Sequence, residues 1–414
     1  MSDPLPDRIH WHINPSARKT AAQKPDTADF SADVIVRVRK FHQTLPNYEP
    51  TPLARLDKLA GCLGVASIRV KDESYRCGLN AFKVLGASYA LSAYLFDRFA
   101  LDPVDVSFAM LKSGRFKDSI SNLTCITATD GNHGRAVAWV ARELGCRAVI
   151  HMPKGTTAAR LEGIRQLGAE AGIIDGNYDD AVELAAEQAH KNNWLLLQDT
   201  VSPGNEETPV RVMQGYLTMF EEAFEQFGGR LPTHVFIQCG VGSLAGSLQA
   251  YLVQKFGPRR PLLTIVEPTL AACYYQSITA PDGLPRRIQG DLATIMAGLA
   301  CGEPSSLSWP ILRNFADAFT ACPDEVTELG MRMLGNPLAG DERVISGESG
   351  AVTLGLLARL LQEPELSPLK QALNFRSDSR VLLFSTEGDT DPDMYRRIVW
   401  GCRKSEGGER NAKV

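Results

Sequence analysis

One stretch decides the fold: S-Y-R-C-G-L-N-A-F-K-V-L-G-A, residues 74–87, in which Lys83 stands between Phe82 and Val84. The residues that follow Lys83 have the apolar spacing of a helix. Apolar neighbours disfavour a charged ammonium, so this setting predicts a lysine that loses its proton near neutral pH. A neutral lysine amine is a nucleophile that forms Schiff bases with carbonyl groups. Taken alone, the pattern also fits a lysine whose stem packs while its head reaches water.

Outward from this stretch, short apolar segments alternate with amphipathic ones. Strands are expected at Ser67–Lys71, Cys125–Thr129, Ala148–Met152, Ala171–Ile174, Trp194–Gln198, Val235–Gln238, Leu262–Glu267 and Val381–Phe384. Helices are expected at Asp33–Phe41, Pro52–Leu63, Gly131–Leu144, Thr157–Leu167, Tyr178–His190, Val210–Phe227, Leu244–Phe256 and Ala351–Leu361, with a last helix after Pro392. The alternation predicts an α/β fold in which helices cover both faces of mostly parallel sheets. The polar residues 1–50 are expected to form a surface arm, and the charged last ten residues to fray.

Composition narrows the class of function. The chain has 414 residues and a net charge of -4, which gives no basic surface for nucleic acid. No apolar run approaches membrane-spanning length, and the N-terminus lacks the layout of a secretory signal, so the cytoplasm is expected. Nine cysteines occur without a C-x-x-C pair, so no metal site is expected.

A glycine-rich loop, residues 239–246 (C-G-V-G-S-L-A-G), follows the strand Val235–Gln238 and opens a helix. Glycines let backbone amides converge on an anion, and a helix N-terminus favours negative charge. The loop therefore predicts a phosphate site. Its spacing also resembles a dinucleotide fingerprint, and Glu267 stands at a strand end where such a fold carries its acidic residue. Both interpretations remain open at this loop.

Three further polar segments follow predicted strands, where ligands bind in open α/β sheets. They are Thr129–Gly134 (T-D-G-N-H-G), Gln198–Thr200 (Q-D-T) and Ser385–Thr390 (S-T-E-G-D-T). Asp130 is expected either to cap the following helix or to contact a ligand. Asp199 has no basic neighbour in sequence and is expected to be able to act as a base.

Together these motifs resemble the pyridoxal-phosphate (PLP) enzymes of the tryptophan-synthase β, or fold-type II, family. The resemblance runs in order from about Leu45 to the last helix. Within that family the set is most similar to the motifs of diaminopropionate ammonia-lyases, including residues 297–302 (A-G-L-A-C-G) and 345–350 (I-S-G-E-S-G). The resemblance implies pyridoxal 5'-phosphate as cofactor and two three-layer α/β/α domains. Their expected bounds are residues 1–88 with 215–414 for the large domain and 89–214 for a small mobile one.

The resemblance also implies roles for individual residues. Lys83 matches the Schiff-base lysine, Phe82 its neighbour at the pyridine ring, and Asn132 the asparagine that binds the phenolic oxygen. The phosphate is assigned to the backbone amides of Gly240, Val241, Gly242, Ser243 and Leu244. Ser385 matches the hydroxyl that faces the pyridine nitrogen, with Thr386 as the neighbouring candidate. Such a partner leaves this nitrogen neutral, which suits β-elimination.

Two carboxylates distinguish the chain from serine and threonine dehydratases, whose turn is similar to S-x-G-N-H. In the resembled lyases a pair like Asp130 and Asp199 acts on D- and L-2,3-diaminopropionate, which yield pyruvate and ammonia. The expected substrate is therefore this small amino acid, in a homodimeric enzyme. A dehydratase on the same fold and, from another class, a nucleotide-binding oxidoreductase are the alternatives. Cys273 and Cys301 are expected close together, as two thiols rather than a disulfide.

Overall fold

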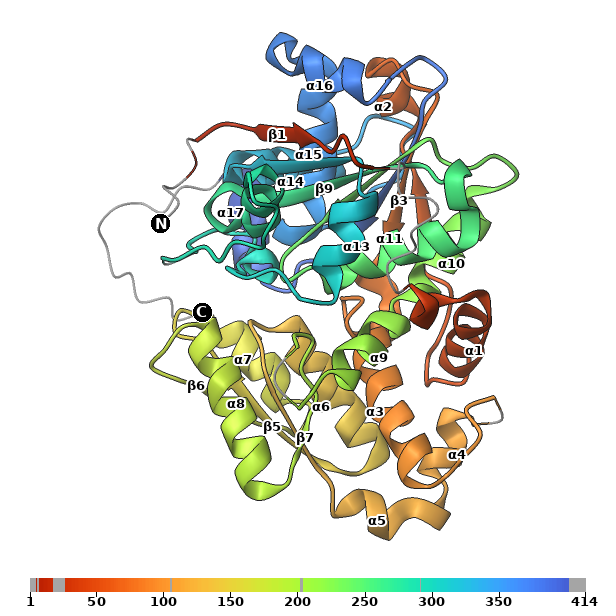
Figure 1. The fold of residues 1–414 in the computed structure, drawn as a ribbon, viewed down its shortest axis with the longest axis vertical. Helices are drawn as coiled ribbons and strands as arrows, with labels where there is room; N and C mark the ends of the chain where they lie inside the picture. The colour runs from red at the N-terminus through yellow and green to blue at the C-terminus, as the bar shows by residue number, and fades with distance from the viewer. Residues whose placement is uncertain are drawn as a thin grey trace, which may run out of the picture.

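The computed structural model describes residue 5 and residues 7–17, 27–104, 106–201, 204–290 and 292–401. Its strands form one seven-stranded and one four-stranded sheet, and Figure 1 shows them in the upper and lower parts of the molecule. The last ten residues of the chain, which were expected to fray, lie outside the described residues. No helix of the described ranges is long and apolar enough to cross a bilayer.

The large sheet has the strand order β1-β10-β9-β8-β11-β3-β2. Its strands are β1 His10–Ile13, β2 Leu53–Arg55, β3 Ser67–Asp72, β8 His234–Gln238, β9 Leu262–Pro268, β10 Ala318–Cys322 and β11 Arg380–Ser385. The two edge strands pair antiparallel with their neighbours, and the inner strands are parallel. The sheet is thus mostly parallel, as the alternation of elements predicts.

The small sheet has the order β6-β5-β4-β7, and all its pairs are parallel. Its strands are β4 Thr124–Ala128, β5 Arg147–Met152, β6 Glu170–Ile173 and β7 Leu195–Leu196. Four of its helices are α6 Asn132–Leu144, α7 Ala158–Arg165, α8 Tyr178–Asn192 and α3 Val84–Arg98. Between α3 and β4 lie two short helices, α4 Phe108–Lys112 and α5 Lys117–Ser121.

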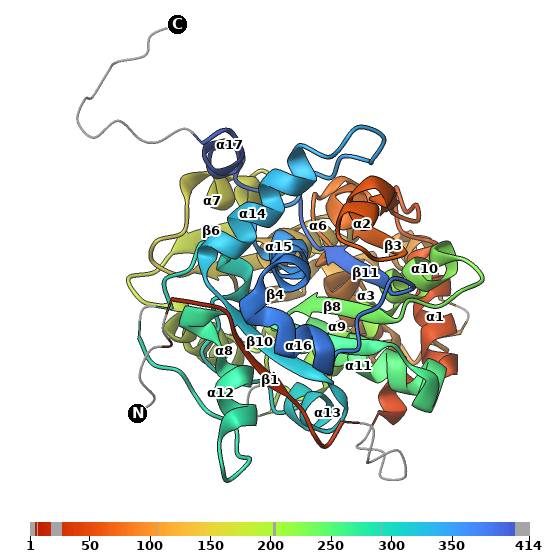
Figure 2. The same ribbon diagram turned by 90° about the horizontal axis from the view of Figure 1, so that it is seen from above.

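The remaining helices surround the large sheet or, like the one that begins at Glu207, pack against α3. They are α1 Ala32–His42, α2 Asp57–Cys62, α9 Glu207–Gly215, α10 Leu217–Phe227, α11 Ser243–Phe256, α12 Cys273–Thr279, α13 Ser308–Phe315, α14 Asp324–Gly335, α15 Glu348–Gln362, α16 Ser367–Ala372 and α17 Pro392–Trp400. Figure 2 shows α14 and α15 next to each other over the sheet.

Each sheet is the middle of three layers. In β8, Val235 and Ile237 pack with helices such as α10 and α11, whereas Phe236 between them packs with α14 and α15 on the other face. This alternation is the two-residue period of a strand buried on both sides. In the small sheet Ile126 packs towards α8, and Ile150 packs towards α6 and α7. The predicted α/β fold with helices on both faces of the sheets is confirmed.

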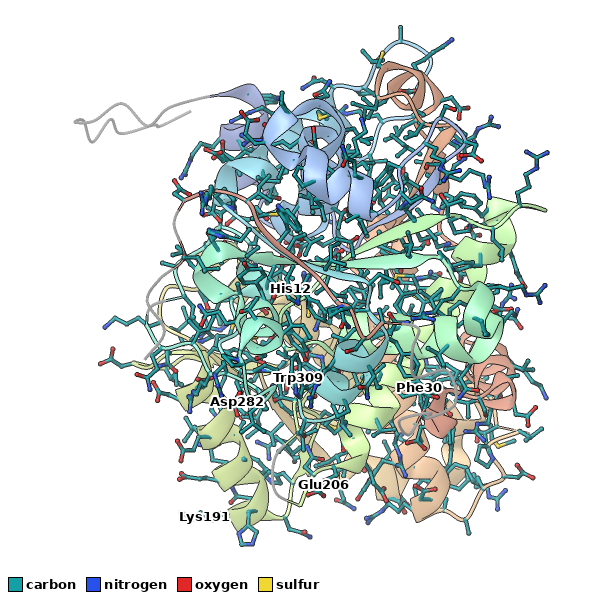
Figure 3. The ribbon with its side chains drawn as sticks, turned by 45° about the horizontal axis from the view of Figure 1, so that its top comes forward. His12, Phe30, Lys191, Glu206, Asp282 and Trp309 are labelled. Carbon is teal, nitrogen blue, oxygen red and sulfur yellow. The ribbon has the colours of Figure 1, made fainter. Side chains whose placement is uncertain are left out.

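Several predicted elements differ from the structure. The arm of residues 1–50 contains β1, which pairs antiparallel with β10 from His10↔Ala321 to Ile13↔Ala318 (Figures 2 and 3, where His12 marks it). The helix expected at Pro52–Leu63 is instead β2 followed by α2, because the main chain pairs with β3 before it coils. The single helix expected at Val210–Phe227 is divided into α9 and α10 at Tyr216.

Candidate active site

One cavity of about 920 Å³ lies where the carboxyl ends of strands from both sheets meet. All but one of the predicted site residues line it. They are Phe82, Lys83, Asp130, Asn132, Asp199, Gly240, Val241, Gly242, Ser243 and Leu244. The cavity thus brings together four sequence motifs that belong to different strand ends.

Ser385 is the predicted residue that does not line this cavity. It is fully buried, and its hydroxyl donates to the carbonyl of Glu387 at 3.3 Å. The next residue, Thr386, does line the cavity, and its hydroxyl accepts a hydrogen bond from Nε2 of Gln238 at 2.7 Å. The predicted position of Ser385 in the site is therefore corrected by one residue, because β11 extends through Ser385 and the side chains of a strand alternate in direction.

Lys83 and Asp199 form an ion pair, with Nζ 2.6 Å from Oδ2. Burial alone would lower the pKa of Lys83, but attraction to Asp199 outweighs it and holds the pKa above its usual value. Burial would raise the pKa of Asp199, but Lys83 and then His133 lower it to about 2. The prediction of a neutral lysine is therefore wrong for this state of the protein. Asp199, which has no basic neighbour in sequence, has one in the folded chain.

Asp130 stands in the turn between β4 and α6. Helix α6 begins after Gly131, and Oγ1 of Thr129 accepts from the amides of Gly131 at 2.9 Å and Gly134 at 3.1 Å. Thr129 therefore satisfies the helix N-terminus, and the interpretation of Asp130 as the cap is wrong. Burial is the main influence on the pKa of Asp130 and raises it, whereas Arg160 and Lys83 act in the opposite direction.

The glycine loop has the shape of an anion cradle. Gly242 has φ +101°, and a Cβ there would come within 1.9 Å of the Tyr274 hydroxyl. A Cβ on Gly240 would lie 3.0 Å from the carbonyl oxygen of Gly298. Only glycine fits both positions, which leaves the backbone beside the N-terminus of α11 open to a phosphate. With a lysine in the same cavity, these residues fit PLP.

The dinucleotide interpretation fails at Glu267. This residue is fully buried and does not line the cavity. Its carboxylate accepts from the backbone amides of Tyr274 at 2.8 Å and Tyr275 at 2.7 Å, so it holds the start of α12. A residue used in this way cannot bind a ribose hydroxyl, which leaves the phosphate interpretation of the loop.

Several residues of the cavity were given no role on sequence grounds. Arg160, Glu348, Ser349 and Glu387 all line it. The last three stand in motifs that the sequence singles out, residues 345–350 and 385–390, whereas Arg160 on α7 carries no sequence signal. Cys301 also lines the cavity, and both it and Cys273 are free thiols, as expected.

The fold and the cavity define a PLP-dependent enzyme of fold type II, and the family model for pyridoxal-phosphate dependent enzymes matches residues 44–375. The diaminopropionate ammonia-lyase of Salmonella typhimurium is 49% identical over 372 residues, which are 89% of this chain and 92% of that protein. Crystal structures of the Escherichia coli enzyme of the same name superpose with TM-scores of 0.88, in complex with D-serine, and 0.86, with an aminoacrylate-PLP azomethine reaction intermediate. Both share 44% identity and cover 96% of this chain and 98% of their own.

The chain therefore belongs to the diaminopropionate ammonia-lyase family of PLP-dependent enzymes. The predictions of fold type II, of PLP as cofactor and of a lyase are confirmed.

Proposed function

We propose that this protein converts both isomers of 2,3-diaminopropionate to pyruvate, with one water consumed and two molecules of ammonia released. The observation that carries the proposal is that Lys83, Asp130 and Asp199 line one cavity. The lysine supplies the link to the cofactor, and two carboxylates on different loops supply two bases. The names of the relatives point to the same substrate.

PLP, when bound, withdraws the electron pair left on the substrate's Cα. Different residues of the chain would bind different parts of it. Lys83 would hold its aldehyde carbon, and Phe82, which packs on Tyr216 with ring centroids 4.7 Å apart, would support its ring. The amides of residues 240–244 would hold its phosphate, and Asn132 its phenolic oxygen. Thr386, rather than Ser385, would face the pyridine nitrogen.

Proton movements follow from the two carboxylates. Lys83 must give up a proton before its amine can react with a carbonyl, and Oδ2 of Asp199 is the acceptor in contact with it. Asp199 returns this proton to the water that the condensation releases, so it is ionised again when the substrate binds. The α-proton of the L-isomer would then go to Asp199, and that of the D-isomer to Asp130. The β-ammonium leaves as ammonia without a separate acid, since it already carries its proton.

An assay of pyruvate formation tests this function. The purified protein should act on D- and L-diaminopropionate and much less on serine or threonine. Greater turnover of L-serine or L-threonine would instead identify a dehydratase. A visible absorbance band that borohydride removes would report the Schiff base independently of the substrate.

Three further expectations are part of the proposal. The division into residues 1–88 with 215–414 and residues 89–214 is supported by the strands, since β4 to β7 all lie in the second range and the other strands in the first. A homodimer and a cytoplasmic location are proposed with it. Light scattering of the purified holoenzyme tests the homodimer, and cell fractionation tests the cytoplasmic location.

A further inference from the structure

Glu387, after β11, is a buried carboxylate of the cavity that the reaction as proposed leaves without a role. It is 3% exposed and lines the cavity. Its Oε2 accepts a hydrogen bond from Nδ2 of Asn132, and its Oε1 accepts from the amide of Ser349 at 3.3 Å. The side chain therefore connects the turn after β4, in the small sheet, with the start of α15 beside the large sheet.

The main chain of Glu387 is held as firmly as its side chain. Its carbonyl accepts from the amide of Gly347 at 3.0 Å, and it pairs with Ala81, two residues before Lys83, in an antiparallel bridge. A Cβ on Gly347 would lie 2.8 Å from Cγ of Glu387, so the polypeptide wraps closely around this side chain. Glu387 is thus fixed relative to the lysine loop and can fix another group in turn.

Two cationic side chains lie near this buried carboxylate. Among the described groups that interact with it are two guanidinium groups, from Arg135 on α6 and Arg160 on α7. Burial lowers the pKa of Arg135, and Glu387 opposes that shift. Burial also acts to lower the pKa of Arg160, but Asp130 and then Glu387 raise it above its usual value. Burial of a carboxylate costs desolvation free energy, so we expect Glu387 to have a function that outweighs this cost.

We propose that Glu387 is a positioning residue that fixes the side-chain amide of Asn132 for the phenolic oxygen of PLP. The Nδ2 atom carries two N–H groups, so donation of one to Glu387 leaves the second for the cofactor. A charged acceptor makes the first hydrogen bond stronger than a neutral one would and holds the amide in one orientation. This inference rests on the proposed role of Asn132.

A double-mutant cycle tests the inference on cofactor binding itself, without turnover. The apoproteins of wild type, Glu387→Ala, Asn132→Ala and the double variant are titrated with PLP, and the dissociation constants are compared. Each single change should weaken binding about tenfold, which is the size of one hydrogen bond to a charged group. The double variant should bind no more weakly than Asn132→Ala, since Glu387 acts through Asn132.

The absorbance of the holoenzymes gives a second readout. Donation from Asn132 favours the ionised phenolic oxygen, so Glu387→Ala should reduce the visible band relative to the near-ultraviolet band, as Asn132→Ala does. Glu387→Gln keeps the volume and one carbonyl acceptor, so it should give intermediate values and keeps the test available if the alanine variant unfolds. Glu348→Ala, which removes another acid of the same cavity, is the matched control. Glu348→Ala should change the dissociation constant for PLP by the same factor in wild type and in Asn132→Ala.

The outcomes separate the two proposals. If the losses of PLP affinity in Glu387→Ala and Asn132→Ala multiply in the double variant, the positioning role is overturned. It is also overturned if Glu387→Ala has the affinity and spectrum of wild type while Asn132→Ala is impaired. If Asn132→Ala itself binds PLP as tightly as wild type with an unchanged spectrum, the role of Asn132 in the proposed function fails, and the inference fails with it.

Discussion

The Nζ of Lys83 lies 2.6 Å from Oδ2 of Asp199, although the two residues are 116 positions apart in the chain. Lys83 precedes α3, and Asp199 follows β7 of the small sheet. The ion pair keeps the lysine protonated and the aspartate ionised, and it sets a proton acceptor next to the amine that must be deprotonated. Under the proposed mechanism, formation of the Schiff base and abstraction of the α-proton therefore both depend on this one contact.

Replacing Lys83 by alanine should abolish the Schiff-base absorbance and turnover while the protein stays folded. It also leaves Asp199, which is 4% exposed, without its cation, so the pKa of this carboxyl should rise from about 2. Absorbance of the PLP-loaded variant checks the loss of the Schiff base, and circular dichroism checks that the variant is folded. Lys154→Ala is the control, because Lys154 also lines the cavity but is exposed and paired with Asp175 at 2.8 Å. A visible Schiff-base band that persists in Lys83→Ala would disprove the assignment.

Glu348 should make the stability of the apoprotein depend on pH. Burial, followed by the neighbouring Glu387, raises the pKa of Glu348 from 4.5 to about 7. Between these values the folded protein binds more protons than the unfolded chain, so stability should fall as pH rises and then level off above about 7. At roughly 1.4 kcal/mol per pKa unit, the loss amounts to about 3 kcal/mol.

Urea unfolding midpoints of the apoprotein, measured on both sides of this pH range, check the prediction. Glu348→Gln removes the titrating group and should flatten the fall in stability relative to wild type. Glu325→Gln is the control, since Glu325 is an exposed partner of Arg359 on the same part of the molecule and should leave the slope unchanged. An equal slope in wild type and Glu348→Gln would show that Glu348 does not titrate in this range.

Gly242→Ala should weaken PLP binding through the shape of the loop alone. The residue has φ +101°, and the added methyl would lie 1.9 Å from the Tyr274 hydroxyl, which itself donates to the carbonyl of Val241 at 2.8 Å. Strain of this kind is worth roughly 1–3 kcal/mol, so the dissociation constant for PLP should rise about tenfold or more. Gly229→Ala, where a methyl meets nothing within 4 Å, should bind normally. Normal binding by Gly242→Ala would show that this loop does not hold the cofactor.

The four strands of the small sheet and β3, β8, β9 and β11 of the large sheet could be predicted from sequence because each is a short apolar run between turn residues. The strands β1, β2 and β10 were not predicted, since they form one edge strand, the other edge strand and the partner of β1, and their pairing is long-range. The residue types of the site were predictable from motifs at strand ends. The charge states of Lys83 and Asp199 were not, because they depend on how the lysine loop meets the small sheet, and no local pattern records that distance.

Each of the two carboxylates, Asp130 and Asp199, should act as the base for one isomer of the substrate. The α-protons of D- and L-diaminopropionate leave from opposite faces of the bound molecule, and one base cannot reach both within hydrogen-bond distance. Asp199→Asn should therefore mainly lose activity on the L-isomer, and Asp130→Asn mainly on the D-isomer. The amide keeps the shape of each side chain and removes the base, so kcat for each isomer is the measurement.

The pH dependence of kcat/KM gives this prediction a second, independent check. A carboxylate accepts a proton only when ionised, so activity falls as pH drops through its pKa in the free enzyme. Burial raises the pKa of Asp130. Burial acts on the pKa of Asp199 in the same direction, but His133, which is not among the residues proposed to bind the cofactor, lowers it even when Lys83 is engaged in the Schiff base. Activity on the D-isomer should therefore fall at a higher pH than activity on the L-isomer. Equal losses for both isomers in both variants, with coincident acid limbs, would contradict two bases and leave Lys83 as the base for both.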